Sequence, residues 1–418
     1  LLQVRTPSIR YTAPHLLGSL FSEFRLMCND AIRIALEYER GHGGQKVKSR
    51  FHLIELAYPR LKQYRLHSQY ILSACEVAFS VYRNRHRRRD PYVKKPFLKL
   101  YPQTYSLNHL IIRIPVRPRQ FVYIILRGSD YLSSFMDDPS LKRGSVTITP
   151  DSLNLAFSKI TDGSPTLGNI GIDVNENNLT WSDSSGLTKR EDLSDVTDIK
   201  ERYKFLRARI AERTRQDRRT NNLLQMKYGR RERNRTIQRL HVISSRIVSH
   251  AKRKKLGIVL EDLKGIRKLY RKRNGQGRLF RGRMNSWAFR EIQRQIDYKG
   301  RWVDLPVTYI KANKTSRKCP DCGSSLTRLE QRNLKCSLCN KIEDRDVIAS
   351  KNILMAALVR AARPPKGSDE VESRRQENAV ILGVDGRKSA LTTSRSIDGT
   401  ESFGYGAEAV DLGVGPQA

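Results

Sequence analysis

Long apolar runs and acidic residues are both scarce in this 418-residue chain. No apolar stretch approaches the about 18–20 residues of a membrane-spanning helix, and no secretory signal opens the sequence, so we expect a cytoplasmic protein. Only 42 Asp and Glu residues oppose 79 Lys and Arg residues, which gives a net charge of +37. Such an excess favours binding to phosphate backbones. A membrane-surface role would need an amphipathic anchor that is not evident.

Histidine and cysteine are also few. The eight histidines are scattered, and none lies near a serine or cysteine in a nucleophile pattern, so acyl-transfer chemistry has no support. Of the six cysteines, Cys28 and Cys75 lie in apolar surroundings and are expected in the core. The other four form two Cys-x-x-Cys pairs separated by 13 residues, namely Cys319, Cys322, Cys336 and Cys339.

This spacing is typical of a closed tetrahedral zinc site, which is structural rather than catalytic. Paired cysteines of this kind also favour a reducing compartment over disulfides. The spacer between the pairs is rich in Arg, Lys and polar residues, which suits a small ribbon lying against nucleic acid. A ribbon that serves only to fold its loop is nearly as compatible with the pattern.

The apolar pattern predicts a multidomain protein with α+β and α/β parts. Residues 1–15 look extended, and residues 16–89 repeat apolar residues at helical steps of three and four. Short apolar runs split by Pro and Gly in 90–160 indicate a small β-barrel. The first fifteen residues would add a strand to this barrel, which makes the helical part an insertion.

Further along, the sequence alternates strands and helices. We expect a strand, turn and strand at 169–181, two long helices within 200–255, and then a strand at 257–261, a helix at 286–298 and a strand at 307–312. Residues 200–255 carry 20 Lys and Arg but only 4 Asp and Glu, a bias that ordinary solvation does not explain. The Gly-, Ser- and Pro-containing residues 362–418 are predicted to be a disordered tail.

Three acidic residues lie at the edges of apolar segments. Asp173 follows Ile170-Gly171-Ile172, Glu261 ends the run from Gly257, and Asp346 precedes an apolar helix. If neighbouring strands bring them together, they would form an oxygen-rich site of the kind that Mg²⁺ prefers, and two such ions can support phosphodiester hydrolysis. Each acid alone is more often a turn or cap residue, and either Asp344 or Asp346 could N-cap the helix that follows.

Taken in this order, the motifs resemble those of the TnpB family of transposon-encoded proteins, relatives of the type V CRISPR effector nucleases. The matching stretches are 171–178, 260–263, 315–323 with the second cysteine pair, and 344–353. The resemblance implies an RNase H-like RuvC nuclease domain whose catalytic, magnesium-binding triad is Asp173, Glu261 and Asp346. Chemistry alone permits Asp344 as the third acid, and the family's Asp-x-x-Ala pattern selects Asp346.

The resemblance also implies a domain plan and partners. The plan comprises a β-barrel wedge domain (1–15 and 90–168), a helical recognition domain (16–89), the nuclease domain (169–312 and 341–361) and a zinc ribbon (313–340). Family members use a guide RNA from the transposon end and cut double-stranded DNA beside a short motif. We therefore expect guide RNA, target DNA, Zn²⁺ and Mg²⁺ to bind a monomer located near a prokaryotic nucleoid.

Two positions depart from the family pattern. Ile348 stands where the family usually has Asn, and Asn340 stands where it often has Gly. Neither change removes a carboxylate or a thiolate, so we expect activity to survive.

Basic residues of two regions are expected to contact nucleic acid: Arg83, Arg85, Arg87, Arg88, Arg89, Arg207, Arg230, Arg231 and Lys254. Aromatic residues near the first block could stack on bases, although such residues more often complete a core: Tyr82, Tyr92, Phe97 and Tyr101.

Two other functions are compatible with the motifs. One is an RNA-guided DNA-binding protein without cleavage, acting as a repressor or transposition accessory factor, which would predict a lost acid. The other is a strand-transfer transposase on the same fold, against which the position of the ribbon between the second and third acids counts.

Overall fold

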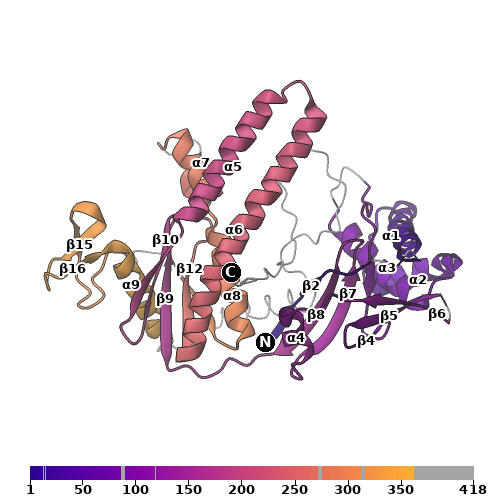
Figure 1. Ribbon diagram of the computed structural model, residues 1–418, viewed down its shortest axis with the longest axis horizontal. Coiled ribbons are helices and arrows are strands. Elements are labelled where there is room, and N and C mark those ends of the chain that lie inside the picture. Colours follow the sequence, from indigo (N-terminus) through magenta and orange to yellow (C-terminus); the bar gives the residue numbers. More distant parts are fainter. Residues whose placement is uncertain are drawn as a thin grey trace, which may run out of the picture. The chain divides into compact units, whose positions relative to one another are not determined.

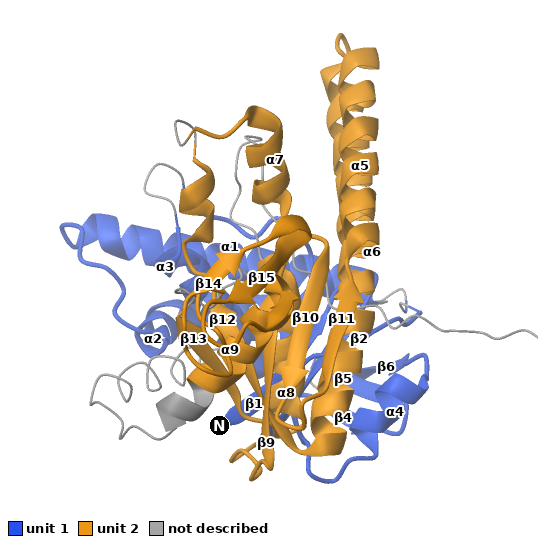
Figure 2. Ribbon diagram, turned by 90° about the vertical axis from the view of Figure 1, so that its left-hand side faces the viewer, with its two compact units in different colours: residues 1–160, 370–418 blue, residues 161–369 orange. Residues whose placement is uncertain are grey.

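The structure, a computed structural model, describes residues 1–12, 14, 16–85, 90–117, 119–271, 275–311 and 316–361. The chain divides into two compact units, one within Leu1–Ile160 and one within Thr161–Asp369 (Figure 2). Among the described residues, no helix is both long and apolar enough to cross a membrane.

The first unit contains the helices that the apolar pattern predicts, here α1 (Leu16–Gly41), α2 (Arg50–Leu61) and α3 (Ser68–Arg83), with a short 3₁₀ turn at Lys62–Tyr64. Helix α2 begins at Ser49, whose hydroxyl accepts a hydrogen bond from the His52 N–H at 3.1 Å. The helices pack through buried aromatic rings. Phe24 of α1 makes edge-to-face contacts with Tyr70 of α3 and with Phe97.

The strands of the first unit form two sheets. One contains β1 (Leu2–Arg5), β8 (Leu153–Ile160), β7 (Lys142–Ile148) and β3 (Leu98–Leu100) in that order, with β2 (Ser8–Ile9) also paired to β8. The other contains β4 (Ser106–Asn108), β5 (Ile111–Arg117) and β6 (Gln120–Ile125). A short helix that the sequence analysis missed, α4 (Asp130–Met136), follows β6 and is N-capped by the Ser129 hydroxyl.

The expected β-barrel is therefore corrected in one respect, since within the described ranges these sheets do not close into a barrel. The N-terminal residues do join the β-rich part, because β1 and β2 pair with β8. Among the described residues of this unit, an isolated bridge from Tyr11 to Leu126 lies outside the named strands and connects segments next to the two sheets. Register shifts at Pro115/Arg117 and Arg143/Val146 mark irregularities of the β-bulge kind, which bend the strands locally.

The second unit is built on one mixed sheet (Figure 1). Its order is β11 (Thr188–Asp192), β10 (Asn178–Asp183), β9 (Gly168–Val174), β12 (Leu256–Asp262) and β13 (Val307–Lys311). Strands β9, β12 and β13 run parallel, whereas β10 and β11 run antiparallel to their neighbours. The C-terminal ends of β9 and β12 therefore lie at the same edge of the sheet.

Helices cover both faces of this sheet. Helices α6 (Arg218–Lys254) and α8 (Phe289–Trp302) pack on the face that carries Ile172 and Leu260. The opposite face is covered by α9 (Arg345–Ala361), through Val259, Ile310 and Ile353. Helix α5 (Ser194–Arg213) forms a long hairpin with α6, and the 3₁₀ turn Ile266–Tyr270 precedes α7 (Arg278–Ser286). The strands and helices predicted between 169 and 361 are thus confirmed.

A small three-stranded sheet precedes α9. It consists of β14 (Leu326–Arg328), β15 (Asn333–Cys336) and β16 (Ile342–Asp344), with a 3₁₀ turn at Glu330–Arg332. We call residues 316–344 the ribbon. Because β16 ends where α9 begins, the ribbon is attached directly to the helix that carries Asp346.

Candidate active site and metal centre

The three predicted acids lie on one face of the sheet at one edge. Register places Leu260 beside Ile172 on the parallel strands β12 and β9, so Glu261 and Asp173 follow at the same level. Side chains two residues apart share a face of a strand. Asp173 therefore lies on the face of Gly171, and Glu261 on the face of Val259, which is the face that α9 covers. Asp346 lies in the first turn of α9.

Gly171 allows this close approach of strand and helix. A Cβ atom at this position would lie 2.3 Å from the Ser350 carbonyl oxygen and 2.6 Å from the Leu354 nitrogen, both backbone atoms of α9. Only glycine lets β9 and α9 pack at this distance. The contact is reinforced by a buried hydrogen bond of 2.6 Å between the hydroxyls of Ser182 and Ser350.

The three carboxylates are buried, with exposures of 8% for Asp173, 9% for Glu261 and 2% for Asp346. Burial raises the pKa of Asp173 to about 7, and the negative charges of Glu261 and Asp346 add to this effect. A hydrogen bond from Asn175 and the positive charge of Arg345 act in the opposite direction. The site therefore concentrates negative charge in a place where ionising all the acids is unfavourable.

Two amide side chains hold these carboxylates, Asn175 in the turn after β9 and Asn178 at the start of β10, and the sequence analysis had not assigned them a role. Asn175 Nδ2 donates to Asp173 Oδ2 at 2.7 Å, and Asn178 Nδ2 donates to Asp346 Oδ2 at 3.2 Å. The turn itself is fixed by Trp287, whose Nε1 donates to the Asn175 carbonyl at 3.0 Å. The three asparagines within five residues after Asp173, namely Asn175, Asn177 and Asn178, were the available signal. Ile348, by contrast, is buried and is not among the amide donors.

The structure separates the roles of Asp344 and Asp346. Asp344 Oδ1 accepts the backbone N–H of Asp346 at 2.8 Å, so Asp344 caps the start of α9. Burial alone would raise the pKa of Asp344, but the Arg190 guanidinium and the backbone N–H groups outweigh it and hold that pKa below its usual value. The carboxylate of Asp346 instead accepts a hydrogen bond from Asn178.

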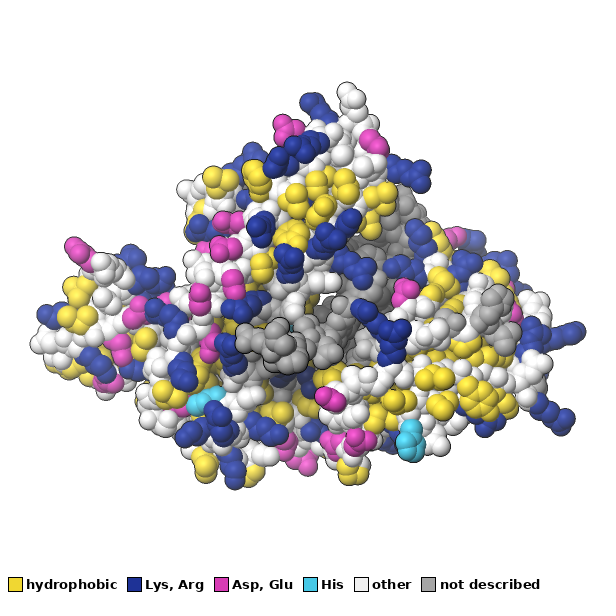
Figure 3. All heavy atoms as spheres, viewed as in Figure 1, with side chains coloured by type: hydrophobic (Ala, Val, Ile, Leu, Met, Phe, Trp, Pro, Cys, Tyr) yellow, Lys and Arg dark blue, Asp and Glu magenta, His cyan; other side chains and the backbone are white. Residues whose placement is uncertain are grey.

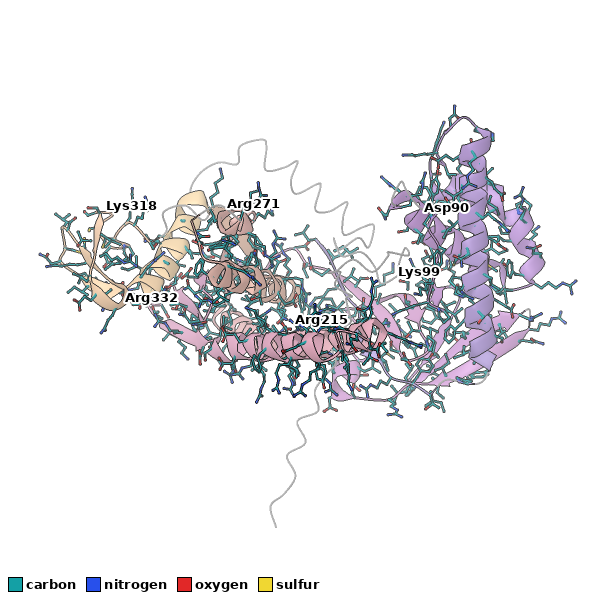
Figure 4. The ribbon with its side chains drawn as sticks, turned by 90° about the horizontal axis from the view of Figure 1, so that it is seen from above. Asp90, Lys99, Arg215, Arg271, Lys318 and Arg332 are labelled. Atoms are coloured by element: carbon teal, nitrogen blue, oxygen red, sulfur yellow. The ribbon has the colours of Figure 1, made fainter. Side chains whose placement is uncertain are left out.

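Two arginines neutralise Asp346. Arg190 of β11 lies 2.6 Å from Asp344 Oδ1 and 3.6 Å from Asp346 Oδ2. Arg332 of the ribbon forms an ion pair with Asp346 Oδ1 and is labelled in Figure 4. About half of each arginine side chain is exposed. Neither residue was found from the sequence, because each comes from a segment whose proximity to Asp346 depends on the fold.

The donor set fits a divalent cation. It contains three carboxylates, the ligand type that Mg²⁺ prefers, and the repulsion that raises the pKa of Asp173 is the kind that a cation relieves. The three carboxylates are not drawn tightly together, however. Among the described residues, only the four cysteines form a group of three or more such ligands with donor atoms all within 4.8 Å of one another.

The four cysteines of the ribbon meet in space. The Sγ atoms of Cys319 and Cys339 lie 3.7 Å apart, and those of Cys322 and Cys336 lie 3.3 Å apart. These separations are far from the about 2.05 Å of a disulfide and near the about 3.8 Å expected for thiolates around tetrahedral zinc. Backbone N–H groups of residues 338 and 339 point at Cys336 Sγ, at 3.4 Å each.

The residue after each cysteine pair adopts a left-handed backbone. Gly323 has φ of 75° and Asn340 has φ of 58°. Asparagine is one of the few residues that enter this region readily. The substitution of Asn340 for the family's glycine is therefore compatible with the same turn.

The predicted nucleic-acid contacts fall into three groups. Arg83, Arg230, Arg231 and Lys254 are exposed. Arg85 is mostly buried and ion-paired with Glu39, and Arg207 is ion-paired with Glu232, so both stabilise the fold locally. The remaining three lie outside the described residues: Arg87, Arg88 and Arg89.

Most of the aromatic residues considered for base stacking belong to the core. Tyr82 and Phe97 are each 2% exposed, and Tyr101 is only partly exposed. Tyr92 is the exception, at 42%. Arg215, in the turn between α5 and α6, is labelled in Figure 4.

Comparisons with known proteins find Cas12f1-like and TnpB-like proteins. The fold is similar to that of Cas12f1 in a cryo-EM structure of its complex with sgRNA and target DNA. The TM-score is 0.51 at 16% identity, over 81% of this chain and 82% of that one. The family model described as Cas12f1-like, TNB domain, matches residues 289–353, which include the ribbon and the start of α9.

The sequence relatives are more specific. A TnpB-like protein of Methanocaldococcus jannaschii is 35% identical over 250 residues, which cover 58% of this chain and 89% of that protein. A provisionally named RNA-guided DNA endonuclease of Streptomyces pristinaespiralis is 32% identical over 126 residues, or 29% of each chain. The chain belongs to the TnpB-like family.

Proposed function

We propose that this protein is an RNA-guided DNA endonuclease of a transposon, which cuts target DNA beside a short motif. The observation that carries the proposal is the convergence of Asp173, Glu261 and Asp346 on one face of the sheet, at the edge where β9 and β12 end. The order of the five strands and the two faces covered by helices suit an RNase H-like, RuvC-type nuclease. Membership of the TnpB-like family supports the same activity.

Asp173, Glu261 and Asp346 would hold Mg²⁺. When bound in pairs, these ions activate a water molecule and stabilise the leaving oxygen in phosphodiester hydrolysis. The chain's own residues prepare the site. Asn175 and Asn178 fix the orientation of two carboxylates from the β9–β10 turn, and burial excludes bulk water.

Arg332 and Arg190 add positive charge at the mouth of the site. Both reach Asp346 while keeping about half of their side chains exposed, so their free N–H groups can contact a phosphate of the scissile strand. Arg332 comes from the ribbon, which we propose is held together by one structural Zn²⁺ bound to the four cysteines. A folded ribbon would thus place the guanidinium of Arg332 beside the carboxylates.

The partners follow from charge and family. We propose that a guide RNA derived from the transposon end pairs with one strand of double-stranded DNA, as in related systems where base pairing reads the sequence. The α5–α6 hairpin, with exposed Arg230, Arg231 and Lys254, offers a phosphate-binding surface. We propose one copy of the chain in each RNA complex.

Cleavage by the purified RNA complex tests the proposal. Asp173→Ala should abolish cutting of a matched DNA duplex while leaving RNA and DNA binding nearly intact. The control is Asp262→Ala, on the next residue after Glu261, where the carboxylate is partly exposed and pairs with Lys264. Cutting by the Asp173 variant would contradict the catalytic assignment, and a parent protein that binds the target but never cuts it would support a nuclease-inactive binding protein.

A further inference from the structure

The three-stranded sheet β4–β6 presents an unusual face to solvent. In β5 and β6 the side chains alternate between buried and exposed, so that Ile112, Ile114, Val122 and Ile124 point inward. The outward positions of an antiparallel sheet are normally polar. Here they are Ile111, Phe121, Tyr123 and Ile125, exposed by 46%, 42%, 60% and 70%. Figure 3 shows hydrophobic side chains gathered over these strands.

An arginine lies at the centre of this face. Arg113 pairs across the ladder with Tyr123, and its guanidinium carbon lies 3.5 Å from the centroid of the Phe121 ring. The guanidinium is therefore stacked on one aromatic ring beside a second one. This arrangement leaves Tyr123, the more exposed of the two rings, open to a further planar group.

The face is supported from beneath. The Tyr70 hydroxyl of α3 donates to the Pro115 carbonyl at 2.5 Å, and the inward side chains of β5 and β6 are at most 4% exposed. The rings therefore stand on a rigid scaffold, so little ordering entropy is lost when a ligand stacks on them.

The charge of residues 106–127 indicates which kind of ligand binds this face. Residues 106–127 contain four arginines and no acidic residue. Tyr, Phe and Arg are also enriched at protein interfaces, so the rings and Arg113 alone do not separate RNA from a protein partner. The unopposed positive charge does, because it favours a polyanion. A planar, uncharged base on a polyanionic backbone matches both the rings and the arginines. On the adjoining strand the same face carries exposed Ser106 and Asn108, polar groups able to reach a ribose 2′-hydroxyl.

We propose that the outer face of β4–β6 is a stacking platform for unpaired RNA, with Tyr123 and Phe121 contacting successive bases and Arg113 contacting the backbone between them. This binding face is independent of the cleavage proposed above, because it lies in the first unit and is tested by binding alone. It also replaces the buried aromatics, Tyr82 and Phe97, that the sequence had offered for stacking.

The test measures binding of a short fluorescent oligouridine to the full-length protein. Raising the salt concentration suppresses binding through phosphate contacts on other basic surfaces, but weakens stacking much less. Under these conditions Phe121→Ala and Tyr123→Ala should each weaken binding by about 5- to 150-fold, since stacking contributes about 1–3 kcal/mol per base. Tyr123→Phe, which keeps the ring, should bind like the parent.

Phe51→Ala is the matched control. Phe51 is 61% exposed and also lies beside an arginine, with Arg50 at 4.7 Å from its ring centroid, but it belongs to α2 rather than to the sheet. Its removal should leave the affinity for oligouridine unchanged. An equal loss in this variant would show that any exposed ring suffices and would overturn the platform.

A second measurement needs no variant. Oligouridine carrying 4-thiouridine should crosslink to peptides within residues 106–127 of the parent protein, and crosslinks confined to other segments would refute the assignment. Equal affinity for the matching oligodeoxynucleotide would refute the preference for RNA. If Tyr123→Ala instead turned a dimer into a monomer without changing RNA affinity, the face would be a contact between copies and the proposal would be wrong.

Discussion

Replacing Asp173 with asparagine should make the magnesium-free protein more stable at pH 8 than its parent, even though the substitution removes a carboxylate that we propose is catalytic. The carboxylate of Asp173 is buried beside Glu261 and Asp346, and its pKa is raised from 3.8 to about 7. Ionising it in the folded protein is therefore unfavourable. The amide of the Asp173→Asn variant would keep the shape and could still accept the hydrogen bond from Asn175, but it would carry no charge.

The direction and the size of this stability difference follow from proton linkage. Between pH 4 and pH 7 the folded protein holds a proton on Asp173 that the unfolded chain has already lost, so the free energy of unfolding falls as the pH rises. Each pKa unit corresponds to about 1.4 kcal/mol, which gives a total of about 4 kcal/mol between these limits. Above pH 7 the free energy of unfolding has fallen by this full amount. The variant lacks this loss, so its advantage should be near zero at pH 4 and largest at pH 8.

Tryptophan fluorescence provides a selective assay. The chain has three tryptophans, Trp181, Trp287 and Trp302, and all lie in the second unit. Trp287 also donates a hydrogen bond to the turn that follows Asp173. Urea unfolding of the full-length chain in buffer without Mg²⁺, followed by this signal at several pH values, therefore reports the unit that contains the site.

Asp344→Asn is the matched control, because Asp344 lies two residues from Asp346 but its pKa is lowered rather than raised. A carboxylate with a lowered pKa contributes stability at neutral pH and loses it in acid, so this variant should be less stable than the parent at pH 8. Added Mg²⁺ should stabilise the parent and not Asp173→Asn. If parent and Asp173→Asn lose stability in parallel between pH 4 and pH 8, the picture of clustered buried charge is refuted.

Three further changes test the packing of the site. Gly171→Ala should abolish cleavage and destabilise the second unit by about 1–3 kcal/mol, because the new Cβ meets backbone atoms of α9. Gly257→Ala on the neighbouring strand meets side chains rather than backbone, with the Asn169 oxygen at 2.4 Å and Pro306 Cγ at 3.4 Å, and should be better tolerated. Equal effects of the two substitutions in urea unfolding would contradict the close-approach argument. Cys319→Ser should lower the zinc content from about one ion per chain, measured by elemental analysis, and unchanged zinc would exclude the ribbon site. Arg332→Ala should slow cleavage by about tenfold or more, whereas Lys318→Ala, on another exposed cation of the ribbon, should not; equal losses would show that ribbon cations act only by attracting nucleic acid.

The sequence was informative where chemistry is local. The cysteine spacing predicted a cluster that the fold brings within 4.8 Å. The strand and helix periodicity predicted the central strands and the long helices of the second unit, but not β11, α7 or the individual strands of the ribbon. Asp173 and Glu261 were identifiable because parallel strands that end in acids bring them to one edge. The choice between Asp344 and Asp346 needed family resemblance, since both lie where a helix begins.

The sequence did not predict which residues from distant segments contact Asp346. Arg190 and Arg332 meet Asp346 only because β11, the ribbon and α9 pack together, and no local pattern encodes those contacts. The exposed face of β6 could not be predicted for a different reason. Its run from Phe121 to Leu126 is apolar at every position, so periodicity could not show which side chains point outward.

The partners of the carboxylates fall into two kinds with different consequences. Asn175 and Asn178 are neutral donors on a turn fixed by Trp287, so their hydrogen bonds are compatible with a bound cation. The arginines are charged, half exposed and drawn to the same oxygens of Asp346 that a cation would need. A cation and Arg332 therefore compete for one carboxylate. A nucleic-acid phosphate that draws Arg332 away would therefore strengthen cation binding. By linkage, the bound cation would strengthen phosphate binding at Arg332 by the same free energy. If Asp346 holds Mg²⁺ as proposed, one ribbon arginine would couple occupancy of the metal site to the arrival of substrate.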